Sequence, residues 1–135
     1  MQYTVQKIVC PQDLMHTEIL PNIEKNAQLI QGVSCLFKAK VLSNNMKIFF
    51  EYQDKMADVN VYLSYGNKMP SKENNTYSTK NPAHIDVIKP MNPALTHVYF
   101  CIVSETDTFV SLKLITKKVV QSKEKIEGKS SQFKA

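Results

Sequence analysis

The stretch from Asp58 to Gly66 alternates between apolar and polar side chains, and this alternation constrains the fold more than any other feature. Its apolar positions are Val59, Val61, Leu63 and Tyr65, and its polar positions are Asn60, Tyr62 and Ser64. A period of two residues is typical of a β-strand with one buried face. An acidic residue precedes the pattern, and a glycine that permits a turn closes it. We expect residues 58–66 to form the central strand of a β-sandwich.

Other short apolar segments recur along the chain with turn signals between them. The strands predicted from them are residues 2–9, 33–42, 46–52, 84–89, 97–103 and 108–115. Residues 23–30 fit a strand or a connector, and residues 12–20 fit one or two helical turns. Because the turn-forming residues 43–45 separate two of the strands, we expect residues 33–42 and 46–52 to pair as a hairpin.

The pattern as a whole predicts an all-β fold, namely an antiparallel β-sandwich or jelly roll of about seven to eight strands. No helical segment is long enough to cover a parallel sheet. We expect residues 1–32 to supply an N-terminal strand and connector, residues 33–116 the sandwich core, and residues 117–135 an extended basic tail. The polar stretch 67–82 predicts a long surface loop, and loops of this length often carry binding residues.

The charge is divided unevenly along the chain. Residues 1–112 carry ten lysines and ten acidic residues, whereas residues 113–135 carry seven lysines and two glutamates. The net charge of +5 therefore belongs to the C-terminal segment. All 17 basic residues are lysine, and the absence of arginine argues against a sequence-specific nucleic-acid reader. A lysine-rich tail instead favours attraction to an acidic surface.

Cysteine usage indicates a reducing compartment. The chain has three cysteines, Cys10, Cys35 and Cys101, and no CxxC pair. An odd number at wide spacing is unlike a secreted disulfide framework, so we expect buried, reduced thiols. The N-terminal residues lack the apolar core of a signal peptide, and the apolar runs are too short to cross a bilayer. These features predict a cytoplasmic protein.

Candidate chemistry is sparse. Asp54, Asp58, Asn60 and Asp86 offer hard oxygen ligands, but turn and strand-edge hydrogen bonding explains them as well as calcium does. No histidine or cysteine spacing matches a zinc site. Cys35 and Cys101 lack the flanking signature of a catalytic cysteine. The sequence therefore predicts no metal, no cofactor and no enzymatic activity.

The order of features over residues 46–115 resembles the bacterial pre-peptidase C-terminal domain, a jelly-roll-like β-sandwich. The resemblance is carried by Asp58 to Tyr62, then Tyr65-Gly66, Pro70 and Asn75 to Tyr77, and by strands at 97–103 and 109–114. Asn60 stands where that family has a second acidic residue, and no tryptophan begins the penultimate strand. The resemblance implies the sandwich fold and, since family members aid protease maturation or bind matrix polymers, a carbohydrate- or polymer-binding role.

The leading functional hypothesis is a non-enzymatic structural or interaction subunit of a larger protein assembly. The sandwich would dock on other protein subunits, and the tail would lie along an acidic surface such as a tubulin-like filament. A microtubule-associated protein of the cytoskeleton or ciliary axoneme is the specific expectation, with no membrane and no specific nucleic acid as partner. The tail residues expected to bind are Lys117, Lys118, Val119, Val120, Lys123, Lys125, Ile126, Lys129, Phe133 and Lys134.

The alternative hypothesis is a β-sandwich module that binds carbohydrate or a matrix polymer. Its ligand face would combine the strand at 58–66 with the polar stretch that follows it. The residues expected there are Tyr62, Tyr65, Asn75 and Tyr77.

Overall fold

In the computed structural model, which describes residues 4–11 and 16–116, two five-stranded sheets pack face to face as a sandwich. The strands are β1 (Thr4–Val9), β2 (Thr17–Glu18), β3 (Ile23–Leu29), β4 (Ser34–Lys40), β5 (Met46–Tyr52), β6 (Val59–Ser64), β7 (Tyr77–Lys80), β8 (His84–Val87), β9 (His97–Ser104) and β10 (Thr108–Thr116). The all-β sandwich expected from the sequence is confirmed. The described residues form no helix, and they therefore include no membrane-spanning helix.

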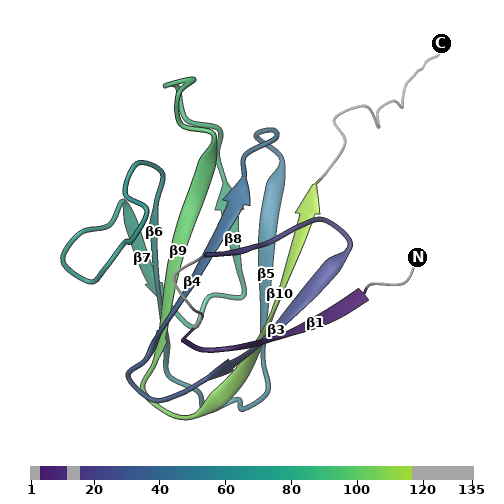
Figure 1. Cartoon of the computed structure of the whole chain (residues 1–135), viewed down its shortest axis with the longest axis vertical. Coiled ribbons are helices and arrows are strands. Elements are labelled where there is room, and N and C mark those ends of the chain that lie inside the picture. Colours follow the sequence, from purple (N-terminus) through teal and green to yellow (C-terminus); the bar gives the residue numbers. More distant parts are fainter. Residues whose placement is uncertain (1–3, 12–15, 117–135) are drawn as a thin grey trace.

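The first sheet, here sheet A, has the order β1-β3-β10-β5-β8, and sheet B has the order β2-β4-β9-β6-β7. Figure 1 shows β6 and β7 at one side of the molecule and β1 at the other. Both sheets are mixed, because β1 pairs with β3 and β2 with β4 in parallel, while all other pairs are antiparallel. These two parallel pairs lie at sheet edges, and the sequence pattern did not predict them.

The core follows from alternation along the strands. In β6 the side chains of Val59, Val61 and Leu63 are buried, as the period-2 pattern predicts. The largest fully buried side chains come from both sheets and fill the space between them; they include Phe37, Ile48, Phe100, Ile102 and Leu112.

Two predictions of strand placement need correction. The stretch at 58–66 is an interior strand, but the middle strand of sheet B is β9, on which β4 and β6 both pair. The segments 33–42 and 46–52 do not form a hairpin, because β4 belongs to sheet B and β5 to sheet A. The short turn between them crosses from one layer to the other. Alternation therefore identified the strands without identifying their partners.

The N-terminal and loop predictions need smaller corrections. The helical turns expected over residues 12–20 are described only for residues 16–20, where Thr17–Glu18 is extended and pairs with β4. The predicted loop 67–82 contains a short polar strand, β7, at the edge of sheet B. The segment left open as strand or connector is the strand β3. Gly32 follows it with a φ of 75°, a left-handed conformation suited to glycine.

The expectation of three reduced thiols is also wrong. Cys10, which follows β1, and Cys35, in β4, form a disulfide that joins sheet A to sheet B. The sequence spacing concealed this pair because the two residues are brought together only by packing of the layers. Cys101 remains a buried free thiol, and burial raises its pKa.

Candidate docking face on sheet A

Several large apolar side chains are exposed on the solvent-facing side of sheet A, where alternating strands usually carry polar residues. On β5 and β10 the inward side chains fill the core, yet Phe49 and Phe109 point outward and are 41% and 37% exposed. The edge strand β1 adds Val5 and Val9, which are 55% and 61% exposed. We call the surface formed by these four residues and the polar side chains between them the outer face.

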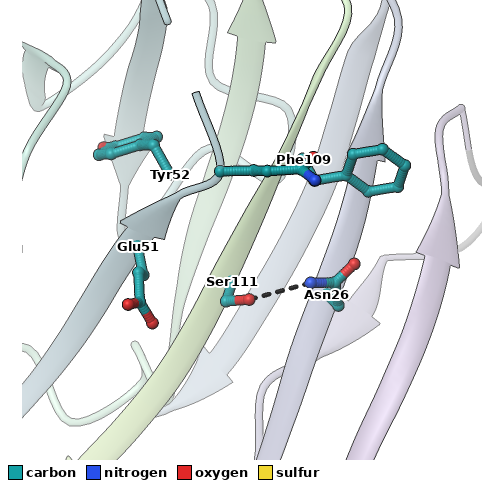
Figure 2. Close-up of a pocket in the computed structure, with 6 residues that line it drawn as sticks. Asn26, Glu51, Tyr52, Phe109 and Ser111 are labelled. Atoms are coloured by element: carbon teal, nitrogen blue, oxygen red, sulfur yellow. Dashed lines mark hydrogen bonds between the residues drawn. The ribbon is translucent and has the colours of Figure 1, made fainter. Parts of the chain in front are cut away.

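Strand register arranges the outer face in rows across the sheet. One row runs from Lys7 on β1 through Asn26 and Ser111 to Glu51 on β5. This row is polar, and the Asn26 amide donates a hydrogen bond to the Ser111 hydroxyl at 3.0 Å, as Figure 2 shows. This hydrogen bond links β3 to β10 and orients the Ser111 hydroxyl on the outer face.

An aromatic residue lies on each side of this polar row. Phe109 is directly opposite Gln28 on β3, and its ring is seen above the Asn26–Ser111 pair in Figure 2. Phe49 lies opposite Lys113 on β10, and its ring centroid is 5.6 Å from that of His84 on β8. The outer face is thus a polar strip between two apolar anchors.

Two adjoining hollows follow these rows. One, of about 500 Å³, is lined by Asn26, Glu51, Tyr52, Gln53, Phe109 and Ser111. The other, of about 550 Å³, is lined by Phe49, Phe50, Glu51, Ala83, Ser111, Lys113 and Ile115. Since both include Glu51 and Ser111, they form one shallow groove over β5 and β10. A groove that continues through two adjoining hollows suits an extended segment better than a compact small molecule.

The charges along the groove are largely paired. Lys113 lies 3.6 Å from Glu24, and Lys47 lies 3.6 Å from Asp86. Exposed pairs of this kind contribute only about 0–1 kcal/mol each, so they serve as a rim more than as a source of binding energy. Tyr52 is turned the other way, since its hydroxyl donates to the Pro82 carbonyl at 2.6 Å and burial raises its pKa.

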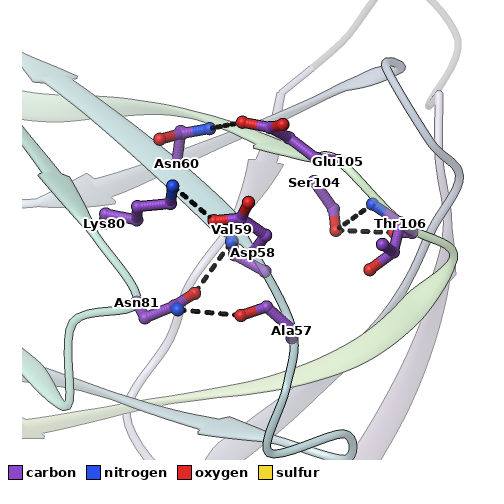
Figure 3. A network of polar contacts seen from close by, with 9 residues as sticks. All are labelled: Ala57, Asp58, Val59, Asn60, Lys80, Asn81, Ser104, Glu105 and Thr106. Atoms are coloured by element: carbon purple, nitrogen blue, oxygen red, sulfur yellow. Dashed lines mark hydrogen bonds and ion pairs between the residues drawn. The ribbon is translucent and has the colours of Figure 1, made fainter.

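The candidate calcium ligands Asp54, Asp58 and Asn60 have structural roles. Asp58 pairs with Lys80 at 2.6 Å, and the Asn60 amide donates to Glu105 at 3.4 Å (Figure 3). Asp54 accepts a hydrogen bond from the Met56 backbone in a turn. Among the residues that the structure describes, no three His, Cys, Asp or Glu side chains come together as a metal site.

The structure separates the predicted ligand residues. Tyr65 and Tyr77 line one cleft at the sandwich edge. Tyr62 alternates with the buried residues of β6 and lies on the outer side of sheet B. Asn75 is used locally, because its amide donates to the carbonyls of Ser71 and Lys72. These four residues therefore do not form a single ligand face.

The predicted tail site, Lys117 to Lys134, lies outside the described residues. The outer face of sheet A, by contrast, was not selected from the sequence. One signal for it was present: on 46–52, Phe49 shares the polar side of the strand with Lys47 and Glu51. An exposed aromatic residue on an alternating strand indicates a contact surface only where other exposed apolar residues share its face, as Phe109 does here.

Neither any protein-family model nor any curated protein matches the chain. The resemblance to the pre-peptidase C-terminal domain stays a prediction.

Proposed function

We propose that this protein is a non-enzymatic interaction module that docks on a partner protein through the outer face of sheet A. The observation that carries the proposal is the pairing of two exposed phenylalanines, Phe49 and Phe109, across a continuous groove. Exposed aromatic residues are the side chains most enriched at interface centres. The side chains along the strip are bonded to each other or exposed, which suits recognition more than catalysis.

The cytoskeletal or axonemal partner proposed from the sequence depends on the basic tail. The outer face adds a second contact that does not depend on the tail. The Cys10–Cys35 bond is relevant to location, because disulfides persist mainly in oxidising compartments. It weakens the proposal of a cytoplasmic protein and leaves the proposal of an assembly subunit unchanged.

The test is a pair of substitutions on the outer face, Phe49→Ser with Phe109→Ser, in the full chain. Partners are identified by cross-linking in the native source, and the best candidate is purified and titrated calorimetrically against each variant. We expect the double variant to bind about thirtyfold or more weakly, as loss of a buried aromatic anchor does. The matched control is Met91→Ser, because Met91 is 99% exposed and lies outside the groove.

Two results would contradict the proposal. Undiminished binding by the double variant, with an unchanged circular dichroism spectrum, would exclude the outer face. Loss of binding only on deletion of residues 117–135 would assign docking to the tail instead.

Carbohydrate binding is the second candidate, and one observation favours it. Beside Phe109 the groove presents amide and carboxylate side chains, Asn26, Gln53 and Glu51, which can hydrogen-bond sugar hydroxyls. These side chains support a sugar site on sheet A more than one at the tyrosines predicted from the sequence. A glycan array separates the two functions: binding that Phe109→Ser removes supports this one, and a blank array rejects it.

A further inference from the structure

A second concave site lies at the edge of the sandwich, and it adjoins the outer face at His84 and Asp86. Here β7 ends sheet B and β8 ends sheet A, so the space between the two layers is open. The cleft measures about 590 Å³, within the range of protein ligand sites. Its apolar lining includes Leu63, Tyr65, Tyr77, Ile85 and Ile88. Tyr77 and Ile88 are 51% and 62% exposed, so this lining is accessible from solvent.

The backbone of β8 faces this cleft with unpaired groups. The Phe50 N–H donates to the Ala83 carbonyl at 2.9 Å, which fixes where the hydrogen bonds between β5 and β8 fall. In an antiparallel pair, successive residues point their N–H and C=O groups alternately toward and away from the partner strand. By this alternation Ile85 bonds to β5, whereas His84 and Asp86 direct both backbone groups away from it.

The next residue on the same side confirms that direction. The Ile88 N–H donates to the Tyr65 hydroxyl at 3.1 Å, so it points into the cleft and not toward β5. Within the described part of the chain, no hydrogen bond occupies the backbone groups of His84 and Asp86. The edge therefore presents two N–H and two C=O groups at strand spacing beside an apolar cleft, an arrangement complementary to the backbone of an extended chain.

Charge restricts what can lie there. Asp86 is the one formally charged side chain among the residues lining the cleft. Its carboxylate lies 3.6 Å from Lys47 and 3.9 Å from His84, and its side chain is 61% exposed. Because such an exposed pair is weak, the Asp86 carboxylate can also form an ion pair with a cationic group of a ligand. Complementarity thus favours a positively charged occupant.

We propose that β8 is an acceptor edge for an extended basic peptide segment of a partner protein. The segment would add as a strand beside His84 and Asp86, place an apolar side chain between Tyr65 and Tyr77, and set a lysine or arginine near Asp86. This site adjoins the outer face at His84 and Asp86, but Phe109 and the hollow beside it are not part of the cleft. It extends the proposed role by supplying a second, backbone-directed contact, and either site can fail without the other.

The first experiment selects binders from a random peptide library on the immobilised full chain. The expected result is enrichment of sequences in which basic and apolar residues alternate.

An enriched peptide is then synthesised in two forms, one unmodified and one N-methylated at alternate residues. N-methylation removes the N–H groups that pair with β8 and retains the side chains. We expect it to weaken binding at least about tenfold. Equal binding of the two forms, or selection without basic residues, would overturn the proposal.

Variants of the protein locate the contact. Asp86→Asn tests charge and Tyr77→Ala tests the cleft, and each is expected to weaken the unmodified peptide several-fold. Asp86→Pro removes one outward N–H without removing a bond to β5, since proline is tolerated at such edge positions. Phe109→Ser is the control and is expected to change nothing. Loss of binding with Phe109→Ser but not with Tyr77→Ala or Asp86→Asn would place the peptide on the outer face and reject this site.

Discussion

At the start of β6, the side chain of Asn81 forms hydrogen bonds to the backbone of the kind that a neighbouring strand would otherwise supply. Its amide oxygen accepts from the Val59 N–H and its amide nitrogen donates to the Ala57 carbonyl, both at 2.8 Å (Figure 3). Its own N–H donates to the Val59 carbonyl at 2.8 Å. Asn81 has a φ of 48°, a left-handed conformation that asparagine tolerates better than most residues.

Two substitutions of Asn81 separate the effect of its side-chain hydrogen bonds from the effect of backbone strain at its left-handed conformation. Asn81→Ala loses both side-chain bonds and keeps the backbone strain, and we expect a loss of about 2–3 kcal/mol in the free energy of unfolding. Asn81→Gly loses the bonds but relieves the strain, so it is expected to lose about 1 kcal/mol less. Urea denaturation measures both. Asn60→Ala is the control, since its 3.4 Å contact with Glu105 is exposed. Equal losses for the alanine and glycine variants would contradict the role of strain.

Lys25 is a basic residue on the inward side of β3, and it is only 4% exposed. Its ammonium donates to the Gln6 side chain. Burial lowers the pKa of Lys25 below its ordinary value, and the charge of Glu18 partly opposes this shift. A buried ammonium retains a desolvation penalty that one neutral acceptor does not fully repay.

We expect Lys25→Met to be at least as stable as the natural protein near neutral pH, by about 0–2 kcal/mol. The sign follows from linkage. Below the lowered pKa both folded and unfolded chains hold the proton, and the penalty is complete. Between that pKa and about 10.5 only the unfolded chain holds it, so the contribution of Lys25 to stability rises with pH. The advantage of the variant should therefore shrink as pH approaches 10.5 in urea titrations. A variant clearly less stable near neutral pH would refute this account.

At the scale of elements, alternation predicted the strands well because side chains in a sandwich must face either core or solvent. It located β6, β9 and β10 within a few residues. Pairing was less predictable, since β4 and β5 have equally suitable apolar faces and either could belong to either layer. The polar strand β7 was missed because an edge strand needs no apolar face of its own.

The candidate site was less predictable than the strands. Tyr62 and Tyr65 are close in sequence, yet one alternates outward on β6 and the other lies in the edge cleft. The outer face combines β1, β3, β10 and β5, which are distant in the chain, so only the sheet order reveals it. Phe49 alone gave a local indication.

At the scale of the whole molecule, the Cys10–Cys35 disulfide ties the two layers together over a sequence separation of 25 residues. Closing a loop of this length in the unfolded chain is worth about 3 kcal/mol. We expect the double variant Cys10→Ala, Cys35→Ala to lose about that much stability in urea denaturation. Cys101→Ala serves as the control, because it leaves the cross-link intact. Titration of three free thiols in the denatured, unreduced protein would show that the bond is absent.

The register of sheet A also fixes the distance between the two aromatic anchors of the outer face. Phe49 lies opposite Lys113, four positions along β10 from Phe109. With a rise of about 3.3 Å per residue and about 4.8 Å between strands, the two anchor positions stand roughly 14 Å apart. The backbone ladder sets this interval. A ligand strand would match it with apolar side chains about four residues apart on one face. A helix would match it less well, because side chains about nine residues apart lie on opposite faces of the helix. For the proposed partner, the register of the sheet thus sets the spacing of the contacts as well as their chemistry.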